Sequence, residues 1–164
     1  MVKHELKLRF GEIDASISIM REVSRWGKEK GFRIWPEEWL TREELLRGDV
    51  RPEDFCLGVE DDKPVCTFIL QRQDSEYWPD ALYGEAVYLH KLCVLHRKNH
   101  KEQTKRIIET LCTFCRKEGI RYIRLDTAMD EEKVKSIYLN AGFQIVKIID
   151  CHNGRYMALY EREV

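Results

Sequence analysis

A basic turn stands between a predicted strand and a predicted helix in the segment YLHKLCVLHRKNHKEQTKRII, residues 88–108. From His96 to Arg106 the chain carries five lysine and arginine residues and one acidic residue, a local charge of +4. Backbone amides at a helix start bind phosphate, so such a turn suits a polyanionic ligand. A turn that cradles phosphate usually contains glycines, and this one has none. An ordinary solvated basic turn is therefore the alternative interpretation.

Two cysteines, Cys112 and Cys115, have the C-x-x-C spacing of redox and zinc sites. A redox pair needs its first cysteine near a helix N-terminus, where the dipole lowers the thiol pKa, whereas this pair falls in the last turns of a predicted helix. The sequence also lacks four zinc ligands at paired short spacings. Cys56, Cys66 and Cys93 lie in apolar, strand-like segments. We expect reduced core thiols and no metal site.

The composition is that of a globular protein of one domain, residues 1–164. A chain of this length buries about two-thirds of its unfolded surface in one core. The 28 lysine and arginine residues nearly balance the 29 acidic residues, so the net charge of -1 gives no global reason to bind nucleic acid. No segment approaches the roughly 20 apolar residues of a membrane span, and the N-terminus has no signal-like apolar run. We expect a cytoplasmic protein with neither nucleic-acid nor membrane partners.

The N-terminal half is predicted to form a strand, two helices and a β-hairpin. These elements are a strand in 5–11, a helix in 14–31, an irregular aromatic connection in 32–39, a helix in 41–48 and a hairpin in 55–73. Asp14 is the expected N-cap of the first helix and Gly31 its stop. Thr41 and Glu44 have the spacing of a capping box for the second helix. The hairpin is expected to turn at residues 61–63.

The C-terminal half alternates strands and helices. After a loop in 74–84, we expect a strand in 85–95, a helix in about 101–117, a strand in 122–128, a helix in 130–143 and strands in 143–150 and 154–163. Asp130 is the expected N-cap of the last helix and Gly142 its stop. This order of elements predicts a mixed α/β fold around one long central sheet.

The order of elements and three stretches of residues resemble the GNAT superfamily of acetyl-CoA-dependent N-acyltransferases over essentially the whole chain. The stretches are YLHKLCV at 88–94, the basic turn and helix that follow it, and YIRLD at 122–126 followed by SIYLNAGF at 136–143. The first half adds WP at 35–36. Leu92, Cys93 and Val94 match the family's apolar-small-apolar triplet at the end of the central strand. Tyr138 matches a tyrosine four residues before the Gly-Phe pair. The Trp-Pro linker and the Tyr-Leu-His strand are similar to those of a bacterial branch. The resemblance implies a central, mostly antiparallel sheet of about seven strands with helices on both faces.

The resemblance also implies transfer of acetyl from acetyl-CoA to a primary amine of a small molecule or peptide, by direct attack in a ternary complex. A protonated amine cannot attack until a base removes a proton, and His90 suits that role. Strand alternation would place Tyr88, His90, Leu92 and Val94 on one face. The arylalkylamine N-acetyltransferases, which share the fold, carry histidines at the positions that match Tyr88 and His90. A hydrogen-bonded histidine at the core edge is the alternative.

Collapse of the tetrahedral intermediate expels a thiolate, and the family uses the tyrosine that matches Tyr138 to protonate it. A packed tyrosine that only fills the core is the alternative role for Tyr138. Backbone N–H groups near Cys93 and Val94 would polarise the thioester carbonyl as an oxyanion hole does.

The resemblance assigns coenzyme A contacts to the strand end, the basic turn and the last helix. These residues are Leu92, Cys93, Val94, Lys98, Asn99, His100, Lys101, Glu102, Gln103, Thr104, Lys105 and Glu131. His100, Glu102 and Thr104 occupy positions where the family has glycine-type residues. A positive φ there would cost on the order of 1–2 kcal/mol, and Glu102 adds a negative charge to an anion site, so we expect weakened affinity. Asn99 stands where the usual arginine would be, and Glu131 where relatives often have asparagine.

Three further questions stay open at this stage. The loss of glycines would also suit a GNAT-fold binding or regulatory module that no longer turns over, whereas nucleic-acid binding through the turn lacks interleaved aromatics. Four aromatic residues could line an acceptor pocket or belong to the core: Trp26, Trp35, Trp39 and Tyr77. The two last strands could pair between subunits in a homodimer.

Overall fold

The computed structural model describes residues 5–95 and 99–164, which cluster into two compact units. The first comprises the described residues of 1–71 and 91–97, and the second those of 72–90 and 98–164. Strand β4 (Ala86–Val94) contributes its first residues to the second unit and its last residues to the first. The expectation of one domain stays a prediction.

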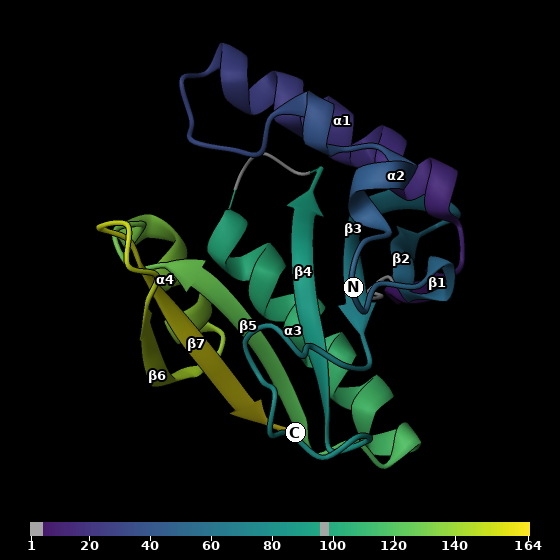
Figure 1. Cartoon of the computed structure of the whole chain (residues 1–164). Helices are drawn as coiled ribbons and strands as arrows, with labels where there is room; N and C mark the ends of the chain where they lie inside the picture. Colours follow the sequence, from purple (N-terminus) through teal and green to yellow (C-terminus); the bar gives the residue numbers. More distant parts are fainter. Residues whose placement is uncertain (1–4, 96–98) are drawn as a thin grey trace. The chain divides into compact units, whose positions relative to one another are not determined.

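The first unit is built on an antiparallel meander in the order β1-β2-β3, next to which lie the last residues of β4. Figure 1 labels its strands and α-helices, which are β1 (Lys7–Phe10), α1 (Ile13–Glu29), α2 (Arg42–Leu45), β2 (Phe55–Glu60) and β3 (Lys63–Gln71). Two 3-10 turns, Glu37–Trp39 and Pro52–Asp54, precede α2 and β2. The apolar stripe of α1 packs against the meander, and Met20, Leu40 and Phe55 are completely buried in that core. The strand, the two helices and the hairpin predicted for this half are confirmed.

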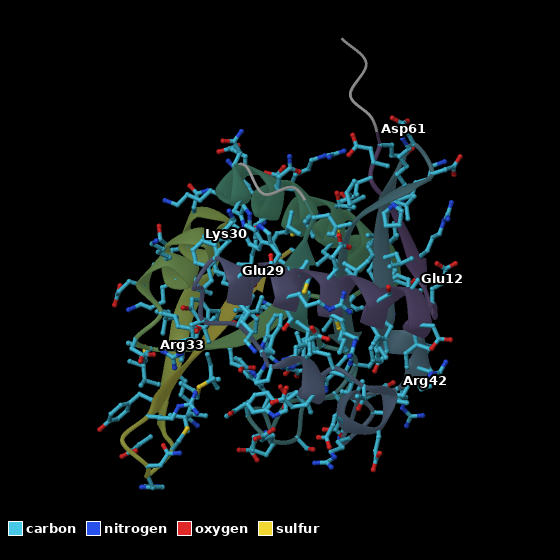
Figure 2. The ribbon with its side chains drawn as sticks, turned by 90° about the horizontal axis from the view of Figure 1, so that it is seen from above. Glu12, Glu29, Lys30, Arg33, Arg42 and Asp61 are labelled. Carbon is cyan, nitrogen blue, oxygen red and sulfur yellow. The ribbon has the colours of Figure 1, made fainter. Side chains whose placement is uncertain are left out.

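The ends of α1 lie close to the predicted positions, but its N-cap does not. The helix begins at Ile13 after Glu12, so the prediction that Asp14 caps it was wrong. Asp14 lies in the first turn, where its carboxylate accepts a hydrogen bond of 2.9 Å from Arg42 Nε. Figure 2 shows Arg42 near the Glu12 end of α1, with Glu29 at the other end. The pairing with α2 therefore takes the carboxylate away from the helix amides.

Local turn chemistry behaves as predicted elsewhere in this unit. Gly31 follows α1 with φ +76, a left-handed conformation that ends the helix at low cost. Thr41 Oγ1 accepts a hydrogen bond of 3.2 Å from Glu44 N at the start of α2, although the helix has only 4 residues. Asp61 and Asp62 have φ of 51 and 60, which gives the β2–β3 hairpin a two-residue turn of type I′.

The second unit contains four strands in the order β4-β5-β7-β6. Its further elements are α3 (His100–Glu118), β5 (Tyr122–Ala128), α4 (Glu132–Asn140), β6 (Gln144–Asp150) and β7 (Tyr156–Glu163). β4 and β5 are parallel, whereas β5–β7 and β6–β7 are antiparallel. The described residues thus form seven strands with mostly antiparallel pairing, which confirms the predicted mixed α/β fold class.

Helix α4 begins one residue later than the predicted cap requires. Glu131 precedes its first residue, so the prediction that Asp130 is the N-cap was wrong. Glu131 N donates to Ala128 O at 3.3 Å, and this bond places Asp130 inside the turn that leaves β5. The predicted stop is confirmed, because Gly142 has φ +91 and Phe143 N donates back to Tyr138 O at 3.1 Å.

The cysteines are free thiols, as predicted. Cys112 and Cys115 are buried on α3, and burial raises the pKa of Cys115 to about 12, the opposite of what a redox cysteine requires. Burial likewise raises the pKa of Cys93 to about 12.

Among the described residues, no helix combines the length and apolar character needed to cross a membrane.

Candidate active site

Strand β4 changes character at the position of the predicted base. It pairs with β5 through Ala86–Tyr122, Val87–Ile123 and Tyr88–Arg124, and in the described residues the ladder ends there. Lys91 has φ 54, a left-handed conformation within the strand. The regular alternation of side chains along the strand is interrupted at Lys91. Strand alternation therefore no longer predicts that Leu92 and Val94 share the face of His90.

Three residues of the predicted cofactor set, Leu92, Cys93 and Val94, belong to the first unit. Cys93 is 1% exposed and packs in the core cluster around α1. Their predicted contacts with the thioester stay predictions.

His90 lies between two carboxylates of the second unit. Its Nε2 is 3.2 Å from Asp74 Oδ2, and its Nδ1 is 3.6 Å from Asp126 Oδ1. Asp74 comes from the loop after β3, and Asp126 comes from β5, two residues beyond the last β4–β5 pair. The side chains are 7% (Asp74), 13% (Asp126) and 23% (His90) exposed. Sequence reasoning identified His90 but neither of its two partners.

Asp74 also stabilises the loop in which it lies, through hydrogen bonds to the backbone. Asp74 Oδ1 accepts a hydrogen bond of 3.3 Å from Tyr77 N, and Asp74 O accepts one of 2.9 Å from Trp78 N. The remaining carboxylate oxygen of Asp74 faces the imidazole. Burial, then the nearby Asp126 charge, raises the pKa of Tyr77 to about 12, so the Tyr77 hydroxyl stays protonated.

Arg124, two residues before Asp126 on β5, forms an ion-pair network. Its Nε donates to Glu161 Oε2 at 2.8 Å, and its Nη1 donates to Glu85 Oε1 at 3.0 Å and to the Tyr88 hydroxyl at 3.1 Å. The guanidinium also lies 4.4 Å from the ring centre of Trp78. Arg124 therefore holds the hydroxyl of Tyr88, which lies two residues before His90 on β4.

Asp74, His90 and Asp126 could together hold a metal ion, because each offers a ligand atom within 4.8 Å of the others. A single ion would have to face both carboxylates and one ring nitrogen. Here the carboxylates face different nitrogens, 3.2 Å from Nε2 and 3.6 Å from Nδ1. The arrangement favours an imidazole held between two acids.

Tyr138 approaches β5 from the other face of the strand. Its ring lies 5.8 Å from that of Phe143 and 6.0 Å from that of Tyr160, whose hydroxyl is 2.9 Å from Thr127 Oγ1. Asp126 and Thr127 are consecutive residues of β5, so their side chains point to opposite faces. His90, the predicted base, therefore lies near a residue on one face of β5, and Tyr138, the predicted acid, packs near the other face.

A pocket of about 610 Å³ lies where the start of α3 meets α4. Its lining residues are Asn99, His100, Lys101, Glu102, Glu132, Lys133, Ser136 and Ile137. The lining combines two lysines with two glutamates, so it is less basic than the sequence of the turn suggests. Four predicted cofactor residues meet here. Four others do not line this pocket: Gln103, Thr104, Lys105 and Glu131. Lys98 falls outside the described residues.

The start of α3 does not have its left-handed residue at the positions where strain was considered. His100, Glu102 and Thr104 are helical residues, and the left-handed conformation falls on Asn99, with φ 57 and ψ 47. Asparagine tolerates that conformation better than most residues. The anticipated strain at the three substituted glycine positions is therefore not present.

The predicted aromatic acceptor residues are distributed over both units. Trp26 packs against Phe32, with ring centres 5.4 Å apart, and Lys91 Nζ lies 4.8 Å from the ring centre of Trp35. Trp39 is 55% exposed. These three tryptophans belong to the first unit and Tyr77 to the second, so an acceptor role for the set stays a prediction.

A family model and several solved structures both relate the chain to GNAT acetyltransferases. The model of the acetyltransferase (GNAT) family matches residues 20–143. Among curated protein sequences, none matches this chain significantly.

Solved structures share the fold at low identity. A GNAT-family acetyltransferase from Listeria monocytogenes is 21% identical, covers 99% of both chains and has a TM-score of 0.74. The ribosomal-protein-S18-alanine N-acetyltransferase from Escherichia coli is 11% identical, with coverage of 98% of this chain and 94% of its own, and a TM-score of 0.62. A GNAT-family acetyltransferase from Elizabethkingia anophelis with acetyl-CoA bound is 12% identical over 67% of this chain and 75% of its own, with a TM-score of 0.53.

Proposed function

Since the chain belongs to the acetyltransferase (GNAT) family, we propose that it transfers an acetyl group from acetyl-CoA to a primary amine of a small molecule or peptide. The observation that carries this proposal is the imidazole of His90, which faces a carboxylate on each ring nitrogen and retains 23% exposure. A partly exposed histidine flanked by carboxylates combines the access and the charged surroundings that a general base needs.

In the proposed reaction, His90 takes one proton from the protonated amine. The free amine attacks the thioester carbonyl carbon, a C–N bond forms, and the C–S bond breaks. Tyr138, which packs on the other face of β5, gives a proton to the departing thiolate and regains one from water, while the nitrogen of the new amide loses its extra proton to water. The products are an amide and a thiol, and the proton on His90 returns to water, so the reaction releases one proton.

The pocket at the α3 start is the proposed site for the diphosphate of acetyl-CoA. Members of this family use acetyl-CoA, and the Elizabethkingia protein contains it. Backbone amides of a helix start bind phosphate oxygens. Lys101 and Lys133 would add positive charge, while Glu102 and Glu132 would oppose it. Binding weaker than that of a glycine-rich turn is expected.

Thermal unfolding in the presence of acetyl-CoA and coenzyme A tests the cofactor. A ligand at 100 times its dissociation constant adds about 2.7 kcal/mol to the free energy of unfolding. No shift at millimolar cofactor would refute the proposal. Binding without turnover of any amine would instead favour a binding or regulatory module.

His90→Gln tests the base. We expect kcat with a panel of primary amines to fall about 100-fold, because general-base catalysis contributes about 10²–10⁴-fold. The dissociation constant of acetyl-CoA should stay the same. His152→Gln is the matched control, since that side chain is 89% exposed. Equal losses of turnover and cofactor affinity in His90→Gln would mean that His90 is structural.

A further inference from the structure

Arg124 contacts the loop between β3 and β4 at two places. The loop covers residues 72–85, and both its middle and its end reach the guanidinium group of Arg124. In the middle, the ring centre of Trp78 lies 4.4 Å from that guanidinium. At the end, Glu85 Oε1 accepts a hydrogen bond of 3.0 Å from Arg124 Nη1. The Arg124 side chain is 8% exposed, so a buried cation lies against this loop.

The position of the Trp78 ring depends on Arg124. In the part of the chain that the structure describes, the buried indole N–H of Trp78 has no hydrogen-bond partner. The ring lies instead against the Arg124 guanidinium and near the ring of Tyr88, whose centre is 6.1 Å away. Arg124 Nη1 also donates to the Tyr88 hydroxyl at 3.1 Å. Tryptophan is the aromatic side chain that binds cations best, so one guanidinium holds both rings.

A short turn joins Trp78 to Asp74. Trp78 N donates to Asp74 O at 2.9 Å, and Tyr77 N donates to Asp74 Oδ1 at 3.3 Å. Because the second bond uses a carboxylate oxygen, the turn fixes the side chain of Asp74 as well as its backbone. Asp74 Oδ2 lies 3.2 Å from His90 Nε2. A displacement of Trp78 would therefore be transmitted through the turn to the imidazole.

The end of the loop is attached more firmly than its middle. Glu85 O accepts hydrogen bonds of 3.1 Å from Arg121 N and Tyr122 N, so the backbone of Glu85 is fixed to the start of β5. Hydrogen bonding from Arg124 lowers the pKa of Glu85, which therefore keeps its negative charge at neutral pH. Leu82, near this end, is 74% exposed and packs little. The middle of the loop thus relies on the contact between Trp78 and Arg124.

We propose that Arg124 is a positioning residue: its guanidinium holds Trp78 and Glu85, and the turn before Trp78 transmits that position to Asp74 and His90. This inference rests on the proposed function, in which His90 is the base. Arg124 does not touch the substrate in this role. Lysine cannot replace it, because an ammonium group has neither the planar face that stacks on an indole nor the fork that donates to two carboxylates.

Two aromatic rings near the same guanidinium give a matched test. The ring centre of Tyr122 lies 5.1 Å from the Arg124 guanidinium, but Tyr122 belongs to β5 and not to the loop. Trp78→Leu should lower kcat about 10-fold with the KM for acetyl-CoA nearly constant, because a displacement of about 1 Å can cost up to about 100-fold in rate. Trp78→Phe keeps a ring for the guanidinium and should retain most of kcat. Tyr122→Leu should leave kcat nearly unchanged, and equal losses in Trp78→Leu and Tyr122→Leu would overturn the inference.

Substitution of Arg124 itself separates its shape from its charge. Arg124→Lys keeps the positive charge but loses the planar stack, so it should lower kcat as Trp78→Leu does. Glu161→Gln is the control, since Glu161 accepts from Arg124 Nε at 2.8 Å but belongs to β7 and has no part in the loop. It should leave kcat nearly unchanged. An unchanged kcat in Arg124→Lys would contradict the proposal.

A measurement that needs no turnover tests the same assignment. In protein labelled with ¹⁵N-histidine, with His90→Gln used for assignment, the ring signals of His90 should shift or broaden in Trp78→Leu and in Arg124→Lys. They should stay in place in Tyr122→Leu and in Glu161→Gln. Thermal unfolding shows which variants are folded, and Arg124→Lys replaces Trp78→Leu in the comparison if the latter does not fold.

The outcomes distinguish this inference from the proposed function. Ring signals of His90 that respond to neither Trp78→Leu nor Arg124→Lys would overturn the inference even if amines are acetylated. The expected response in a protein that acetylates no amine would count against the proposed function and support the positioning of His90 by Arg124.

Discussion

Tyr138 combines two contributions that one substitution can separate. Its ring packs against Phe143 and Tyr160, whereas its hydroxyl is the proposed proton donor to the thiolate. Tyr138→Phe keeps the ring, so we expect kcat to fall about 10- to 100-fold, at the lower end of acid catalysis, with little change in melting temperature. Tyr156→Phe, at a side chain 51% exposed, is the control. An unchanged kcat would assign Tyr138 to packing alone.

At the residue scale, sequence reasoning identified the imidazole but not its partners. His90 was identified because a histidine within an apolar strand is chemically unusual and its position matched a known family. Asp126 could have been found from strand register: His90 follows Tyr88 by two residues, and Asp126 follows Arg124 by two. Asp74 gave no such signal, since it lies in a loop whose path depends on its own bonds to Tyr77 N and Trp78 N.

At the element scale, the start of α3 decides how well an anion binds. Glu102 lines the pocket in the first turn of α3, where its negative charge offsets the positive end of the helix dipole and repels a phosphate group. Glu102→Gln should therefore tighten coenzyme A binding about two- to fivefold, the equivalent of about 0.3–1 kcal/mol. Calorimetric titration measures this change, which should shrink as salt increases.

Glu109→Gln provides the matched control for that titration. Glu109 is exposed on the same helix, but it lies beyond the first turn and does not line the pocket. Its substitution should leave affinity unchanged. Similar effects of the two variants would mean that only net charge matters and that the pocket at the helix start is not the binding site.

The left-handed conformation of Asn99, before α3, should affect the free energy of unfolding. Asn99 has φ 57, where alanine is disfavoured by about 1–2 kcal/mol and glycine is not. Urea unfolding should therefore show Asn99→Ala to be about 1 kcal/mol less stable than Asn99→Gly. Equal stabilities would indicate that this turn relaxes into another conformation.

Elements were predicted more accurately than their first residues. Apolar periodicity and glycine stops gave the strands and helices, because both depend on residues near in sequence. The caps Asp14 and Asp130 were wrong because other contacts determine them: Arg42 binds Asp14, and the Glu131–Ala128 bond encloses Asp130. The interruption of β4 at Lys91 has no local signal, since lysine has no preference for positive φ.

At the scale of the whole molecule, buried thiols and phenols are present in both units. Burial raises the pKa values of Cys93, Cys115 and Tyr77 to about 12. It also raises those of four further groups: Cys56, Tyr88, Cys112 and Tyr160. Each of these groups keeps its proton in the folded protein at a pH where the unfolded chain has lost it. Their stabilising contribution is therefore complete below the unfolded values and is lost as pH rises.

The free energy of unfolding should consequently decline steeply between pH 9 and 12, from the ordinary thiol value of 9.0 to the raised value of about 12 for Cys115. Each group contributes up to about 1.4 kcal/mol per pH unit, because the unfolded state binds one proton fewer. Cys115→Ala removes one such group, so the slope from urea unfolding should decrease by up to that amount even though the variant is less stable at pH 7. Thr113→Ala, exposed on the same helix and without a titrating group, should keep the slope. A stability that stays constant to pH 11 would contradict the burial of these thiols in solution.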